Sequence, residues 1–240
     1  MGVYGMRSEL KEAREVLGKL RELDATYAAT VGAGHDPSQR VDHHRIFLLL
    51  YFYTTVRWLQ FAEESDCPAF FNRFLVEFYL RYVDYVFTPA INNVSGRCPH
   101  WQGYFRWADV YRRQPGHLTR VTLLRFGAYA HTRYDLAEAI AAASRVVGHA
   151  ERAKAEREIV GARSGRVFSG AALDFVLNCD RLLPEIVLSP RLRSFCLYVH
   201  RNDYWWLPRF QQWRRAAWHD AMRMVETGRT SLTADRIAVS

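Results

Sequence analysis

The chain has 240 residues, of which 49% are hydrophobic and 24% charged, a length and composition typical of a soluble globular protein with one well-buried core. Its net charge of +8 would suit an anionic partner, but the basic residues are scattered along helical segments instead of forming one contiguous run. We therefore expect a small-molecule substrate and no nucleic-acid partner.

The first half of the chain is predicted to form three helices separated by loops, because apolar residues recur at the helical period. Ser8 is the expected N-cap of the first helix, and Asp42 is expected to cap the second. Pro89 is expected to end the third helix. The helices are predicted over residues 7–23, 42–64 and 70–87, with loops over 31–40 and 92–103.

The second half continues in the same way, with no alternating β-branched runs and no repeat. Its helices are predicted over residues 104–113, 118–147, 171–186, 192–203 and 209–226. Residues 229–240 form a polar tail that we expect to be frayed. The sequence therefore predicts one all-α domain over residues 1–240, a bundle of roughly seven to nine helices.

The cysteines and the apolar runs indicate the compartment. Cys67, Cys98, Cys179 and Cys196 show no Cys-x-x-Cys spacing, so neither a zinc knuckle nor a disulfide framework is predicted. The N-terminus has no apolar signal core, and the run from Ile46 to Val56 is too short to span a bilayer. We expect a reduced, cytoplasmic protein without stable membrane insertion; its oligomeric state stays open.

His131 and Asp135 are the first candidate catalytic residues. They are four residues apart on the predicted helix 118–147, so they share one helical face. Asp174 and Asn178 repeat this spacing on the helix 171–186, and two such helices can form a four-group cluster in a bundle core. His131, Asp135 and Asp174 would suit Zn, Fe, Mn or Mg. The alternative is a hydrogen-bond network that ties two helices together.

Further residues are candidates for contacts with a substrate. Glu77 and Arg81 belong to a charged stripe on an aromatic helix, which is either a solvated face or one side of a cavity. Arginines interleaved with tryptophans near Arg214 and Trp218 could bind a planar or anionic group, or could simply pack an amphipathic helix. The candidate substrate-binding set is Arg45, Tyr51, Thr54, Glu77, Arg81, Tyr134, Arg214 and Trp218.

The order of these motifs resembles that of a bacterial family described only as a domain of unknown function. The resemblance covers about Asp42 to Met222 and includes an Ala-His-x-x-x-Asp-Leu helix and a C-terminal Arg-x-x-Ala-Trp helix. Asn178 departs from it, because its spacing from Asp174 is one residue shorter than in the family pattern. The residues that match are Asp42, Arg45, Phe47, Tyr51, Thr54, His131, Asp135, Arg214, Ala217 and Trp218.

Two classes of function remain open from the sequence. The first is an enzyme of bacterial specialised metabolism, in which an aromatic-lined helical pocket binds a largely apolar small molecule beside the His/Asp centre. Cyclase or lyase chemistry on an isoprenoid or polyketide-like substrate then competes with metal-dependent hydrolysis. The second is a non-catalytic helical protein that binds a small molecule.

Overall fold

The structure is a computed structural model that describes residues 3–32, 42–92, 94, 98–182 and 207–232. Its helices are α1 (Val3–Gly32), α2 (Arg45–Glu63), α3 (Pro68–Tyr82), α4 (Thr88–Ile91), α5 (Gln102–Arg113), α6 (His117–Ala130), α7 (Leu136–Val146), α8 (His149–Val160), α9 (Ala162–Leu182) and α11 (Leu207–Glu226). Short 3₁₀ turns precede two of them, η2 (Asp42–His44) before α2 and η4 (Pro99–Trp101) before α5.

Two π-helical turns join helices without a break. η3 (Val83–Phe87) joins α3 to α4, and η5 (His131–Asp135) joins α6 to α7. Counted through these turns, the described residues form eight helical segments and no strand. The predicted all-α bundle of seven to nine helices is confirmed.

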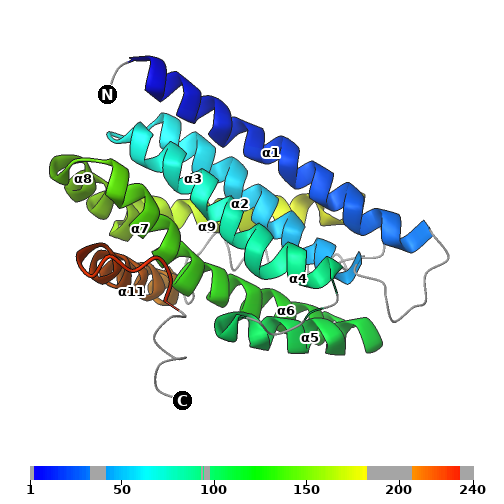
Figure 1. The fold of residues 1–240 in the computed structure, drawn as a ribbon. Helices are drawn as coiled ribbons and strands as arrows, with labels where there is room; N and C mark the ends of the chain where they lie inside the picture. The colour runs from blue at the N-terminus through cyan, green and yellow to red at the C-terminus, as the bar shows by residue number, and fades with distance from the viewer. Residues whose placement is uncertain (1–2, 33–41, 93, 95–97, 183–206, 233–240) are drawn as a thin grey trace.

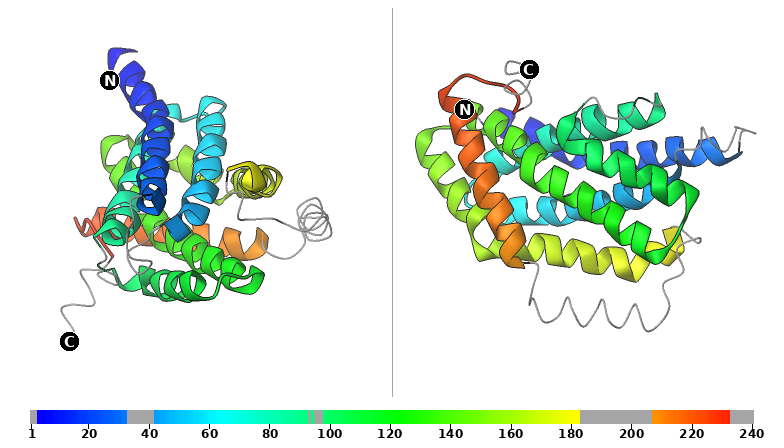
Figure 2. Two further views of the ribbon diagram at one scale, coloured as in Figure 1. Left: turned by 90° about the vertical axis from the view of Figure 1, so that its right-hand side faces the viewer. Right: turned by 90° about the horizontal axis from the view of Figure 1, so that it is seen from below.

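The helices form a bundle around an aromatic core. Figure 1 shows α1 along the outside of α2 and α3, with α9 against α2. The rod made of α6, η5 and α7 crosses beneath them, with α5 packed on α6 and α11 packed on α7 (Figure 2). Every described segment thus buries one face against its neighbours.

Small residues set the distances between these helices. Gly127 lies where α6 meets α2, and a Cβ atom there would be 2.6 Å from the ring of Phe47. The face of α7 is built from buried alanines, among them Ala137 and Ala141. The close approach brings the end of α6 and the start of α7 against the aromatic side chains of α2 and α3.

Several local predictions are corrected. α1 begins at Val3, so Ser8 is inside the helix and is not its N-cap. The N-cap position of α2 is occupied by His44, because the 3₁₀ turn places Asp42 before the helix. The helix α8 was not predicted. The helical geometry also continues past Pro89 to Ile91, because Pro89 follows the π-helical turn η3 and lies at the start of α4.

The ends of the chain complete this comparison. The predicted helix 192–203, most of the loop 31–40 and residues 233–240 lie outside the described residues. Of the tail predicted over 229–240, residues 229–232 are described, and Ser231 and the backbone N–H of Leu232 both donate to Glu138 of α7. In the part of the chain that is described, no helix is long and apolar enough to cross a membrane.

Candidate active site

The carboxylate of Asp135 is the centre of a buried polar network. Asp135 is fully buried and accepts a hydrogen bond from Nδ1 of His131 at 2.7 Å. Its other oxygen, Oδ1, accepts from Nε2 of His100 at 2.9 Å, and the indole N–H of Trp101 lies 3.1 and 3.2 Å from the two oxygens. Three donors from two distant parts of the chain thus meet at one carboxylate.

These contacts decide the charge and the tautomers. Burial opposes ionisation, but the hydrogen bonds from His100 and His131 outweigh it and hold the pKa of Asp135 below its ordinary value. Burial also lowers the pKa of His131, although Asp135 opposes this shift. Because an ionised carboxylate only accepts, each facing nitrogen must carry a hydrogen. In the neutral form of each ring, the lone pair is therefore on Nε2 of His131 and on Nδ1 of His100.

The two histidines face different surroundings. His131 is stacked on Phe78 with ring centroids 3.7 Å apart, and the edge of Tyr51 meets it at 4.6 Å. Its Nε2 is buried and has no hydrogen-bond partner among the described residues. Aromatic rings thus enclose the imidazole of His131, and Asp135 is its hydrogen-bond partner among the described residues.

His100 lies at the edge of the network, beside a thiol. Tyr134 is stacked on its ring at 4.9 Å, and Tyr85 meets it edge-on at 5.4 Å. The Sγ of Cys98 is 3.2 Å from Nδ1 and 3.4 Å from Nε2 of His100. The thiol of Cys98 is therefore in direct contact with the imidazole of His100.

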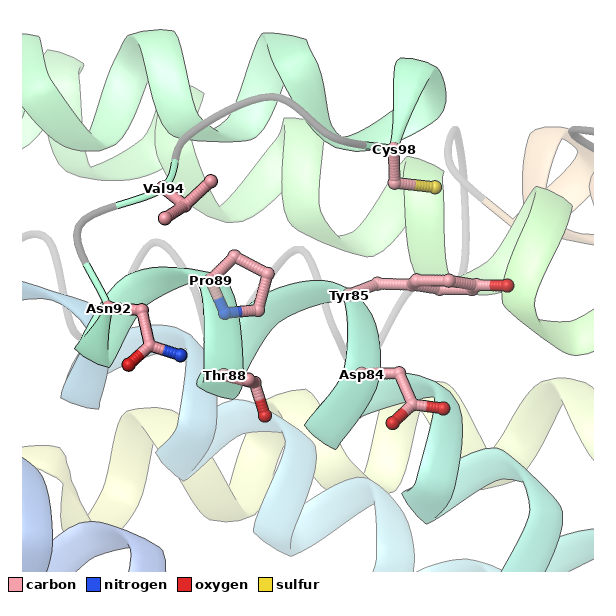
Figure 3. A pocket seen from close by; sticks show the side chains of 7 residues that line it. All are labelled: Asp84, Tyr85, Thr88, Pro89, Asn92, Val94 and Cys98. Atoms are coloured by element: carbon pink, nitrogen blue, oxygen red, sulfur yellow. The ribbon is translucent and has the colours of Figure 1, made fainter. Parts of the chain in front are cut away.

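Cys98 and Tyr85 also line a pocket of about 450 Å³, a size that suits a small molecule. Figure 3 shows the thiol of Cys98, the ring of Tyr85 and the carboxylate of Asp84 extending toward the same end of it. The described lining residues are Asp84, Tyr85, Thr88, Pro89, Asn92, Val94 and Cys98. The pocket therefore offers both polar and apolar groups beside the thiol.

A second buried carboxylate stands behind Tyr85. The Tyr85 hydroxyl donates to Oε2 of Glu138 at 2.7 Å, and Nε of Arg81 is 3.3 Å from the same oxygen. The other oxygen of Glu138 accepts from Ser231 and from the backbone of Leu232. Burial, followed by the charge and hydrogen bond of Glu138, raises the pKa of Tyr85. This wall of the pocket is thus held in place by a network of its own.

Both π-helical turns contribute to this region. η5 carries His131 and Asp135 in the network and Tyr134 on His100, whereas η3 carries Asp84 and Tyr85 of the pocket. Such turns are rare inside helices and occur often at functional sites, because the extra residue re-aims the side chains. Their meeting at one place is an independent reason to call this the candidate active site.

The first pair predicted from the sequence, His131 and Asp135, is brought together, but Asp174 is not part of the network. Both oxygens of Asp174 accept from Arg57 of α2, at 2.7 and 2.9 Å. The side chain of Asn178 donates to the backbone carbonyl of Asp174. The predicted four-group cluster is therefore not formed, because α9 packs on α2 and its carboxylate is taken by an arginine.

The donor set for a metal is likewise not assembled. Among the described residues, no group of three or more His, Cys, Asp or Glu side chains is arranged to hold a metal ion. His131 and Asp135 do not meet Asp174, and their contacts with each other are hydrogen bonds. The residues present do not fit the predicted Zn, Fe, Mn or Mg site.

The predicted substrate-binding residues fall into two groups. Tyr51 and Tyr134 contact the histidines of the network, and Arg81 holds the wall of the pocket through Glu138. The others make structural contacts away from the pocket lining. Arg45 pairs with Asp24, Thr54 donates to the Leu50 carbonyl, Glu77 pairs with Arg73 and Arg81, Arg214 donates to carbonyls at the end of α8, and Trp218 packs near Phe70.

The expected aromatic-lined pocket also differs from the structure. The aromatic rings around His131 pack against one another as a core, and the described pocket has Tyr85 as its aromatic wall. Burial, followed by the charge of Arg215, lowers the pKa of Arg214 to about 10, in keeping with its place inside the bundle.

Cys98, His100 and Trp101 were missed by the sequence reasoning. They stand close together in "CPHW", a segment interpreted only as part of a loop. The available signal was a cysteine and a histidine two residues apart in a predicted loop, since a thiol beside an imidazole is one arrangement that activates a nucleophile. The sequence could not show that Asp135, 34 residues beyond Trp101, supplies this partner.

Comparisons with known proteins give no further assignment, since no family model, no curated protein and no solved structure matches the chain. The resemblance to the bacterial family of unknown function therefore stays a prediction, and the site alone carries the functional argument.

Proposed function

We propose that the protein is an enzyme that forms a covalent acyl intermediate on Cys98, with His100 as the general base and Asp135 as its orienting carboxylate. One observation carries the proposal: a pocket-lining thiol contacts an imidazole whose other nitrogen is held by a buried, ionised carboxylate. Nucleophile, base and orienting group in this order are the common arrangement of covalent acyl transfer.

The reaction begins with a carbonyl compound in the pocket. Cys98 loses its S–H proton to the Nδ1 lone pair of His100 while the sulfur bonds to the carbonyl carbon. The tetrahedral intermediate then collapses, the bond to the leaving group breaks, and His100 returns the proton to that group. The acyl group stays on the sulfur as a thioester until a second nucleophile attacks it, with His100 again taking and returning a proton.

The thiol follows the general-base route and is not a preformed thiolate. Burial raises the pKa of Cys98 to about 12, and the negative charges of Asp135 and Glu138 add to the effect. A neutral thiol is a weak nucleophile, so its proton must leave as the new bond forms. This is the step for which an oriented imidazole is needed.

The second nucleophile decides the reaction class. A hydroxyl or carbon nucleophile within the acyl chain would give cyclisation, in line with the polyketide-like chemistry expected from the sequence, and water would give hydrolysis. We favour a small, partly apolar substrate because Tyr85, Pro89 and Val94 stand beside polar groups in the pocket. The free thiols Cys67 and Cys98 support the proposal of a cytoplasmic protein.

The alternative is a non-catalytic binding protein in which the same network is structural. The complete burial of Asp135 favours it, since its hydrogen bonds with His100 and Trp101 tie the segment before α5 to the rod of α6 and α7. In that case Cys98 would be an inert wall residue.

Acylation of the Cys98 thiol by a reactive ester distinguishes the enzyme from the non-catalytic binding protein. The protein is mixed with p-nitrophenyl acetate and p-nitrophenyl butyrate, p-nitrophenolate release is followed, and the acylated peptide is identified by mass spectrometry. We expect a burst and an adduct on Cys98 that are lost in Cys98→Ala and slowed about 100-fold or more in His100→Gln. Cys67→Ser, which removes another buried thiol, is the matched control and should behave as wild type.

An adduct on Cys98 that forms equally fast in His100→Gln would contradict the role of His100. The absence of any adduct on Cys98 would contradict the enzyme proposal and favour the binding protein.

A further inference from the structure

The pocket end beside Cys98 is crowded with carboxylates. Asp84 lines the pocket, and Glu138 and Asp135 stand directly behind Tyr85 and His100. Of these three, Asp84 is the exposed one, with 57% of its side chain accessible, whereas Glu138 and Asp135 are buried. A ligand in the pocket can therefore contact the carboxylate of Asp84 directly, and the charges of the two buried carboxylates act on it from behind the pocket wall.

Among the described residues, the guanidinium of Arg81 is shared by three carboxylates of this region. Nε of Arg81 is 3.3 Å from Glu138, one of its terminal nitrogens is 3.6 Å from Glu77, and the other is 3.8 Å from Asp84. Glu77 also pairs with Arg73. In these contacts between described residues, the guanidinium groups of two arginines face the carboxylates of three acidic residues. Of the three carboxylates, that of Asp84 is the farthest from Arg81. The pocket carboxylate is thus the least neutralised of the set.

The pKa of the Cys98 thiol indicates the sign of the local electrostatic field. After burial, the charges of Asp135 and Glu138 are the next causes that raise the pKa of Cys98. Among the described residues, the charges that act on this thiol thus make its end of the pocket negative, although the chain as a whole carries a net charge of +8. Anionic substrates, such as free phosphates or carboxylates, would be repelled from it, and a cation would be attracted.

We propose that the pocket accepts an acyl donor bearing a protonated amine, whose ammonium group binds Asp84 beside the face of Tyr85 while its carbonyl carbon is presented to Cys98. This inference deepens the proposed function and rests on it. The ring of Tyr85 supplies a second attraction, since an aromatic face binds a nearby cation.

The substrate cation also activates the thiol. An ammonium group near Cys98 offsets the negative field that disfavours the thiolate, so the S–H proton passes more easily to Nδ1 of His100 as the sulfur attacks the carbonyl carbon. The C–O or C–S bond to the leaving group breaks, the leaving group takes the proton from His100, and the aminoacyl thioester remains on Cys98. A substrate of the right charge thus makes the thiol more reactive than an uncharged one does.

The test compares two esters that differ by one charge. The p-nitrophenyl esters of leucine and of isocaproate have the same carbon skeleton, and only the leucine ester carries an ammonium group. Each rate of Cys98 acylation is divided by the rate of the same ester with β-mercaptoethanol, which corrects for intrinsic reactivity. Wild type, Asp84→Asn and the control Asp66→Asn, an exposed carboxylate in the turn after α2, are compared, with Cys98→Ala as background.

In wild type we expect the corrected rate for the leucine ester to exceed that for the isocaproate ester by about three- to tenfold, the range for one partly exposed ion pair with an added aromatic contact. The ratio should fall to about one in Asp84→Asn and stay at the wild-type value in Asp66→Asn.

Equal corrected rates in wild type, or a ratio that survives in Asp84→Asn, would overturn the ammonium proposal while leaving acyl transfer intact. Failure of both esters to acylate Cys98 would instead overturn the proposed function itself.

Discussion

Replacing Asp135 with Asn tests the network at its centre while keeping the size of the side chain. Three N–H donors converge on this carboxylate, from His100, His131 and Trp101. An asparagine offers one acceptor oxygen and presents its own NH₂ group where the other oxygen was. At least one histidine must then change its tautomer or lose its hydrogen bond.

The expected cost follows from these contacts. A hydrogen bond to a charged group contributes about 1.5–3 kcal/mol, and a buried donor left unpaired adds to the loss, so we expect destabilisation by about 3 kcal/mol. In a chain of this length, that corresponds to a fall in Tm of roughly 6–12 °C. If His100 is the residue that changes its tautomer, its Nδ1 gains the hydrogen and can no longer accept the thiol proton. Loss of the equivalent carboxylate in a Ser–His–Asp triad costs about 10⁴ in rate, and acylation of Cys98 should fall toward that extent.

The assay is thermal unfolding followed by circular dichroism, together with the acylation rate of Cys98. Asp109→Asn is the control, because this half-buried carboxylate pairs with Arg112 and Arg113 on α5, away from the pocket lining, and should cost less than about 1 kcal/mol. The contribution of Asp135 should be complete above the ordinary aspartate pKa and lost as the pH falls through its lower folded value. A Tm within a degree or so of wild type, with acylation unchanged, would refute the assigned role of the carboxylate.

Three further predictions concern other parts of the molecule. His131→Ala should lower the free energy of unfolding by about 2–4 kcal/mol in a urea titration, because it empties a stacked core position, and a loss below about 1 kcal/mol would contradict that packing. Burial lowers the pKa of both His44 and His131, so these side chains bind protons more readily in the unfolded chain than in the folded one. The free energy of unfolding should therefore fall by up to about 1.4 kcal/mol per pH unit for each histidine as the pH drops below about 6.5. A free energy of unfolding that stays constant across this range in urea titrations would contradict this prediction. Asp174→Asn should weaken the half-buried ion pair with Arg57 and leave the acylation of Cys98 at the wild-type rate. Loss of acylation in this variant would instead support the four-group cluster predicted from the sequence.

The sequence predicted what depends on local periodicity. The 3.6-residue recurrence of apolar residues identified most of the described helices, and the i, i+4 spacing placed His131 and Asp135 on one face. Both results follow from the geometry of a single helix and need no knowledge of its neighbours.

The remaining features depend on which segments meet. Arg57 lies 117 residues before Asp174 and takes the carboxylate that was expected beside His131. His100 and Trp101 reach Asp135 from a segment that carries no helical pattern of its own. The π-helical turns add a residue to a helix without any distinctive composition. The periodicity of apolar residues therefore predicts one continuous α-helix at each of them and does not reveal the turn.

The central claim is that Asp135 fixes His100 with its hydrogen on Nε2 and its lone pair on Nδ1, beside the thiol of Cys98. Long-range proton–nitrogen correlation of the imidazole groups in nitrogen-labelled protein, at about pH 8 where an ordinary histidine is neutral, reads this tautomer directly. The account predicts a protonated Nε2 and an unprotonated Nδ1 for His100 in wild type, with this pattern altered in Asp135→Asn. A His100 that carries its hydrogen on Nδ1 in the wild-type protein would contradict the account.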